Sequence, residues 1–178
     1  MSARHLFLTG EPQCGKSTLI RRVLARHPEW RVGGFLTCSI VEEGYRRVHM
    51  MPAARPDAPR TQHNLVGEGD WRQVGKRYPE VFDTLGVQLL EEGAGADLLL
   101  MDELGTMESE ALAFQHAVFR ALDCDTPVLG VLKHKSNPFL DALRQRCGLR
   151  VLEVGPHSRD ALVDEVDAAL IKWIDQSR

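Results

Sequence analysis

Gly10-Glu-Pro-Gln-Cys-Gly-Lys-Ser17 is the stretch that decides the fold of this 178-residue chain. It matches the phosphate-binding pattern G-x-x-x-x-G-K-[ST], which chance produces in roughly one chain of this length in a hundred or fewer. Glycines let the backbone wrap around phosphate oxygens with its N–H groups pointing inward. The helix that follows adds unpaired N–H groups and the positive end of its dipole. The stretch therefore predicts a polyphosphate-binding P-loop.

Lys16 and Ser17 have separate predicted roles within this loop. Lys16 would reach the β- and γ-phosphates as a binding and catalytic residue, and the Ser17 hydroxyl would ligate Mg²⁺. The structural alternative is a glycine turn followed by a surface lysine. The loop's position favours the phosphate role, because a short apolar strand (5–8) precedes it and a helical pattern (16–27) begins at Lys16.

A second motif ends the apolar run 96–101, where Asp102 and Glu103 follow directly. The carboxyl ends of parallel strands border one crevice, so we expect these carboxylates on the same side as Ser17. Asp102 would hold Mg²⁺, directly or through a water, and Glu103 would orient or deprotonate the water that attacks the γ-phosphate. Glu108 is a second candidate base; alternatively, it complements the dipole in the first turn of a helix.

Strands alternate with helices along the rest of the chain, which predicts an α/β fold in one P-loop NTPase domain, 1–178. We expect a mostly parallel sheet with helices on both faces. An inserted β-hairpin is predicted over 32–50, with its turn at Glu43-Gly44. An exposed loop is predicted over 52–64. Further helices are predicted over 79–92, 111–122 and 138–146 and after Ser158, and further strands over 128–132 and 151–154.

Two basic stretches are candidates for phosphate contact. The segment 46–77 holds seven Arg and Lys residues against three acids, and it is either a solvated loop or a flap that meets phosphates through guanidinium groups. Lys133-His134-Lys135 follows the strand after the acidic motif. We expect Lys133 or Lys135 to touch the nucleotide, where a cation would stabilise charge on the phosphates.

Composition and charge exclude several classes of protein. The 22 Lys and Arg residues against 25 Asp and Glu give a net charge of −3, which does not favour general nucleic-acid binding. The four cysteines include no CxxC pair, so no zinc site is predicted. Apolar runs fall far short of the ~20 residues that a membrane span needs. The P-loop strand begins too early for a signal peptide, and we expect a soluble, cytoplasmic protein.

With both motifs in place, the chain resembles the THEP-type, or cancer-related, nucleoside-triphosphatases. The resemblance covers most of the chain in order, through 10–18, 34–37, the D-E-L-G-T-M-E stretch 102–108, and 133–139. It implies a usually monomeric P-loop enzyme that hydrolyses ATP, GTP and other NTPs to NDP and phosphate with Mg²⁺. It also implies nucleotide contacts at Gly10, Glu11, Pro12, Gln13, Cys14, Gly15, Lys16, Ser17, Thr18, Asp102, Glu103, Leu104 and Gly105.

The chain departs from the family pattern at Gln13, where glycine is usual, and at Thr106, which replaces a lysine. Both changes bear on phosphate affinity and rate. The chain has no N-K-x-D guanine-reading motif and no LSGGQ signature, so hydrolysis of low base specificity is the first hypothesis. A nucleotide or small-molecule kinase, with segment 46–77 as its lid, is a second. Glu103 argues mildly against it, since a water-activating base promotes hydrolysis. A slow nucleotide-dependent regulatory module is the third.

Overall fold

The computed structural model of the chain describes residues 4–155 and 158–177; residues 1–3, 156, 157 and 178 of the predicted domain lie outside this part. Within it, eight strands form one sheet in the order β5-β4-β3-β2-β6-β7-β1-β8. The strands are β1 (His5–Thr9), β2 (Val32–Glu42), β3 (Tyr45–Pro52), β4 (Leu65–Asp70), β5 (Lys76–Arg77), β6 (Leu98–Leu104), β7 (Val128–Leu132) and β8 (Leu149–Glu153).

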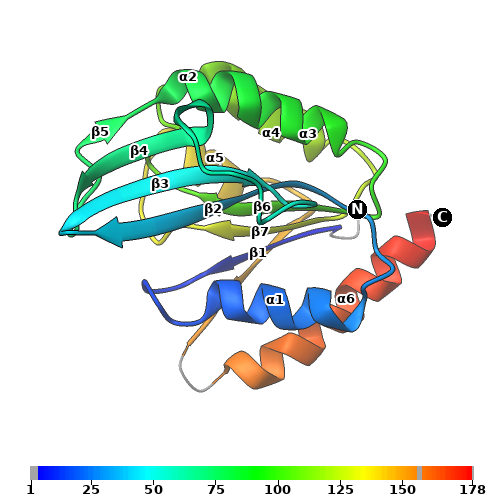
Figure 1. Ribbon diagram of the computed structural model, residues 1–178. Coiled ribbons are helices and arrows are strands. Elements are labelled where there is room, and N and C mark those ends of the chain that lie inside the picture. Colours follow the sequence, from blue (N-terminus) through cyan, green and yellow to red (C-terminus); the bar gives the residue numbers. More distant parts are fainter. Residues whose placement is uncertain (1–3, 156–157, 178) are drawn as a thin grey trace.

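Helices cover both faces of this sheet (Figure 1). α1 and α6 lie on one face, and α2, α3, α4 and α5 lie on the opposite face. None of the helices in the described ranges combines the length and apolar character needed to cross a membrane. The helical elements are α1 (Lys16–Arg26), η1 (Gln62–Asn64), α2 (Pro79–Val81), the π-helical turn η2 (Phe82–Gly86), α3 (Val87–Glu92), α4 (Leu112–Ala121), α5 (Pro138–Arg144) and α6 (Arg159–Ser177).

The sheet is parallel from β2 through β6, β7 and β1 to β8, and antiparallel from β2 through β3 and β4 to β5. The prediction of a mostly parallel α/β sheet with helices on both faces is therefore confirmed. The hairpin is also present, with Glu43 and Gly44 both at positive φ, 50° and 78°. This pair of conformations suits a two-residue hairpin turn. Because β2 also pairs with β6, the hairpin is continuous with the parallel sheet.

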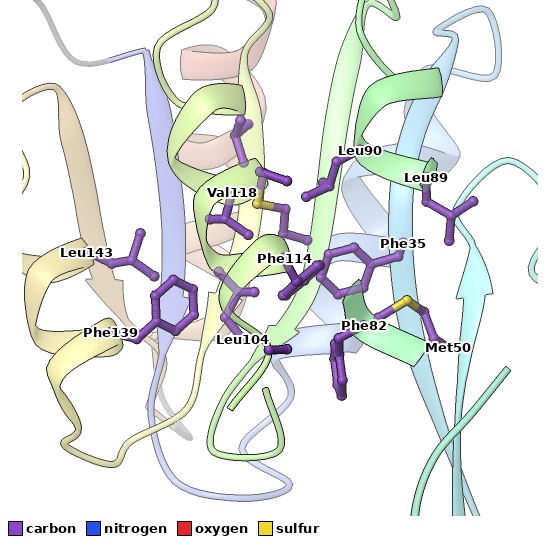
Figure 2. Close-up of a cluster of buried hydrophobic side chains, with 14 of the residues drawn as sticks. Phe35, Met50, Phe82, Leu89, Leu90, Leu104, Phe114, Val118, Phe139 and Leu143 are labelled. Atoms are coloured by element: carbon purple, nitrogen blue, oxygen red, sulfur yellow. The ribbon is translucent and has the colours of Figure 1, made fainter. Parts of the chain in front are cut away.

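Buried apolar side chains pack on each face of the sheet because side chains alternate along every strand. On β1, Leu6 and Leu8 pack with α1 and α6, whereas Phe7 packs on the other face. The second face centres on aromatic rings (Figure 2), with the Phe114 ring 5.2 Å from Phe82 and 5.5 Å from Phe35. These two layers fix the strand ends that border the site.

Two features differ from the sequence-based expectations. β4 and β5 lie where no strand was predicted, because β4 contains Gly67 and Gly69 and lacks apolar alternation. The predicted helix 79–92 is interrupted by η2. There the Asp83 carboxylate accepts a hydrogen bond of 2.9 Å from the Phe114 N–H, in the first turn of α4. This hydrogen bond thus links the η2 turn to the start of α4.

The outer half of the β2–β3 hairpin extends beyond the parallel strands. The pairing of β2 with β6 ends at Leu36 and Asp102, whereas β2 continues to Glu42. Figure 1 shows the hairpin turn on the same side of the molecule as the loop between β1 and α1. The hairpin therefore overhangs the edge where the predicted motifs lie.

Candidate active site

The P-loop joins β1 to α1 and holds Lys16 inside its curve. Gly10 and Gly15 have φ values of 139° and 103°, which side chains other than glycine rarely adopt. A Cβ at Gly10 would also lie 2.6 Å from the Val154 carbonyl oxygen. The Lys16 ammonium donates to the carbonyl oxygens of Gly10 and Glu11, at 2.9 and 2.8 Å. The loop therefore has a defined shape around a lysine that is only 9% exposed.

Ser17 and Asp102 meet at the edge of this loop. The Ser17 side chain lies beside the Asp102 carboxylate. Burial, and then the negative charge of Glu103, raises the pKa of Asp102 to about 6, against the opposing effects of Ser17 and Lys16. The structure thus brings together the two residues predicted to hold Mg²⁺.

Glu103 borders a cavity of about 770 Å³ that it shares with the P-loop. Its Oε1 lies 3.6 Å from the Lys133 Nζ, and its side chain is 30% exposed. Several cations surround this space, which makes it suited to a polyphosphate. The cavity is lined by Gly10, Glu11, Pro12, Gln13, Gly15, Lys16, Ser17, Thr18, Arg46, Arg72, Glu103, Lys133, His134 and Lys135.

Both basic stretches contribute to this cavity. Lys133, His134 and Lys135 all line it. Of the basic residues in segment 46–77, Arg46 and Arg72 line it. The sequence alone does not distinguish these two among the seven basic residues there. The position of Arg46 depends on how far the β2–β3 hairpin extends beyond β6, and that of Arg72 on the loop after the unpredicted strand β4.

Comparison with known proteins decides which family this geometry belongs to. A protein-family profile described as NTPase matches residues 5–167. The chain belongs to this NTPase family. The resemblance drawn from the sequence motifs is confirmed.

Named relatives and solved structures agree with this family. Nucleoside-triphosphatase THEP1 of Methanosarcina acetivorans is 32% identical over 164 residues, 89% of this chain and 92% of that protein. THEP1 of Thermotoga petrophila is 30% identical over 167 residues, 90% and 89% of the two chains. The fold is similar to the crystal structure of THEP1 from Aquifex aeolicus, with a TM-score of 0.73, 22% identity, and 93% and 98% coverage. It is also similar to the solution structure of a human cancer-related nucleoside triphosphatase, with a TM-score of 0.67, 22% identity, and 99% and 100% coverage.

Four residues expected to contact nucleotide do not line the cavity. Asp102 lies beside Ser17, which does line the cavity. The Leu104 side chain is fully buried in the apolar cluster. Cys14 packs against the cluster on the α1 side. Gly105 is buried, with its N–H donating to the Glu108 carboxylate and its carbonyl accepting from the Asn137 side chain at 3.2 Å.

Glu108 has neither of its two predicted roles. It is 1% exposed and does not line the cavity, so it is not placed to act as a base. α4 begins at Leu112, so Glu108 does not lie in the first turn of a helix. Its Oε1 accepts from the Gly105 N–H, while Oε2 has no hydrogen-bond partner among the residues described. Burial raises the pKa of Glu108 to about 7. Glu108 therefore holds the turn that follows Glu103.

The two departures from the family pattern have different surroundings. Gln13 lines the cavity and has a φ of 63°, in the left-handed region that favours glycine. Thr106 does not line the cavity, and its carbonyl accepts a hydrogen bond of 3.1 Å from the Arg77 guanidinium. Gln13 is thus the departure that bears directly on the loop.

Proposed function

We propose that this chain hydrolyses nucleoside triphosphates to nucleoside diphosphate and phosphate. The observation that supports this most is that Glu103 and the P-loop residues Lys16 and Ser17 line the same cavity. A P-loop alone serves kinases and hydrolases equally. A carboxylate in the same cavity as the loop supplies the acceptor that an attacking water needs.

In the proposed reaction, water attacks the γ-phosphorus and its proton passes to Glu103. The bond from the γ-phosphorus to the β–γ bridging oxygen breaks, and the electron pair leaves with the nucleoside diphosphate. Lys16 and the loop N–H groups stabilise the charge on the phosphate oxygens. Lys133, within ion-pair distance of Glu103, orients that carboxylate and adds a positive charge to the site.

We further propose Mg²⁺ as the cofactor, held by Ser17 and Asp102. The donor set fits, because a hydroxyl and a carboxylate are hard oxygen ligands and Asp102 has no cationic partner within ion-pair distance among the residues described. Mg²⁺ takes its remaining ligands from phosphates and water, so such a site needs few protein groups. When bound, the ion neutralises phosphate charge.

The test is phosphate release from ATP, GTP, CTP and UTP with Mg²⁺, comparing the wild type with Glu103→Gln. We expect release from all four without any acceptor, and its loss in the variant while nucleotide stays bound. Nucleoside and nucleoside-monophosphate acceptors are added in parallel reactions. A phosphorylated acceptor without free phosphate would establish a kinase instead. Wild-type rates in Glu103→Gln would show that Glu103 is not the base.

A monomeric state and a cytoplasmic location remain predictions, which size-exclusion chromatography and cell fractionation would check.

A further inference from the structure

The overhanging part of the hairpin brings Arg46 to the phosphate-binding cavity. Arg46 lies on β3, where it pairs with Val41 of β2 and Gly69 of β4, beyond the point at which β2 separates from β6. Its side chain lines the cavity together with the P-loop and Glu103. The neighbouring Arg47 points to the opposite face of the strand and borders a different hollow, with Glu42 and Arg60.

Arg46 has no ion-pair partner in the part of the chain that the structure describes. Its Nε is buried without a hydrogen-bond partner, and no described carboxylate lies within ion-pair distance of it. Arg47, in contrast, lies 3.7 Å from Glu42. An unsatisfied buried donor on a charged group costs free energy. A guanidinium has the planar fork that matches phosphate oxygens, so a phosphate would satisfy this group.

The strand order indicates which phosphate Arg46 would meet. β3 adjoins β2, and β2 adjoins β6, which carries Glu103 one residue before its end, whereas β8 lies at the other edge of the sheet. Arg46 is therefore on the Glu103 side of the P-loop. Glu103 is the proposed base for the water that attacks the γ-phosphorus. The terminal phosphate is consequently the part of the nucleotide that faces Arg46.

Other cations that line the cavity have interaction partners within the protein. Lys16 is bound by loop carbonyls, and Lys133 lies beside Glu103. Arg72 also lines the cavity, from a loop in which its backbone N–H donates to Asp70 at 2.7 Å. Its guanidinium is stacked on Trp71, at 4.9 Å from the ring centroid. Among the described residues that line the cavity, Arg46 is thus the cation with a buried donor that lacks a hydrogen-bond partner.

We propose that Arg46 binds the terminal phosphate of the nucleoside triphosphate and stabilises the charge that develops on it during hydrolysis. This inference rests on the proposed function. Arg46 would act within the same chain, as cis arginines do in other phosphoryl-transfer enzymes. The hairpin would then be part of the catalytic site, with β3 supplying a group that the two sequence motifs lack.

The test compares Arg46→Gln and Arg46→Lys with the matched control Arg47→Gln. Calorimetry with Mg²⁺ measures the affinity for ADP and for a non-hydrolysable ATP analogue, and phosphate release gives kcat. For Arg46→Gln we expect kcat to fall at least ~100-fold. We expect affinity for the analogue to fall at least ~10-fold and affinity for ADP to change less than ~2-fold. Arg46→Lys should be intermediate because it keeps the charge and loses the fork.

Thermal unfolding establishes whether each variant is folded. If Arg46→Gln does not fold, the same comparison of kcat and affinities is made with Arg46→Lys. An equal loss of affinity for ADP and the analogue would overturn the proposal, as would Arg46→Gln hydrolysing ATP at the rate of Arg47→Gln. If the wild type released no phosphate, the proposed function would fail. The difference between ADP and analogue binding would still test the role of Arg46 independently.

Discussion

The Lys133 ammonium lies 3.6 Å from Oε1 of Glu103, across the carboxyl ends of the neighbouring strands β7 and β6. Two hydrogen bonds fix the backbone of Lys133 at this contact. The Lys133 N–H donates to the Leu104 carbonyl at 2.8 Å, and the Lys133 carbonyl accepts from the Arg144 guanidinium at 2.8 Å. The orientation of the proposed base therefore depends on a lysine that follows the end of the neighbouring strand β7.

Replacing this lysine should slow hydrolysis more than it weakens binding. In Lys133→Met, we expect kcat to fall by roughly 10- to 100-fold, because Glu103 loses its partner and the site loses a positive charge. Steady-state kinetics with ATP measure kcat and KM separately. Lys172→Met, on the exposed side of α6 and away from the cavity, is the control. A Lys133→Met enzyme with wild-type kcat would remove Lys133 from the mechanism.

Lys16→Ala should remove most of the nucleotide affinity. Lys16 is the buried cation at the centre of the P-loop, and losing such a charge contact should weaken Mg·ATP binding by at least ~100-fold. Its hydrogen bonds stay within the loop, so the fold should persist. Calorimetry with Mg·ATP checks the affinity, and circular dichroism checks the fold. Unchanged affinity in a folded variant would contradict the assigned phosphate site.

The sequence located the two motifs because each is short and follows a strand. Asp102 and Glu103 are adjacent, and the P-loop residues are consecutive, so no tertiary information is needed to group them. Arg46 could not be selected in the same way, because its place depends on how far the hairpin extends beyond β6. The role of Glu108 was also hidden, since only the shape of the loop shows that its carboxylate reaches the Gly105 N–H.

Gln13 offers a test of strain in the P-loop. Its φ of 63° costs a residue with a side chain about 1 kcal/mol. Gln13→Gly removes this cost, but glycine also increases the conformational entropy of the unfolded chain, which favours unfolding by a comparable free energy. We therefore expect the free energy of unfolding to change by less than about 1 kcal/mol. Gln13→Val should destabilise the protein by more than about 1 kcal/mol, because branching at Cβ worsens the clash. Urea denaturation ranks the three proteins. A valine variant as stable as the wild type would show that the loop is unstrained there.

The last prediction concerns the pH dependence that Glu108 contributes to stability. Burial raises its pKa in the folded protein to about 7, from an ordinary value of 4.5. The folded state therefore holds this proton more tightly than the unfolded state does. The contribution of Glu108 to stability is full below about pH 4.5 and is lost as the pH rises to about 7. The loss can reach about 1 kcal/mol per pH unit within that window.

Glu108→Gln removes this titration while keeping an oxygen that can accept from the Gly105 N–H. We expect the free energy of unfolding of the variant, relative to the wild type, to increase between pH 5 and pH 8. Denaturant unfolding at both values measures this difference, in which the contributions of other titrating groups cancel. The constant cost of burying an amide shifts both values equally, so the change with pH is the decisive quantity. Parallel pH profiles would mean that the Glu108 carboxyl titrates near its ordinary pKa in the folded protein.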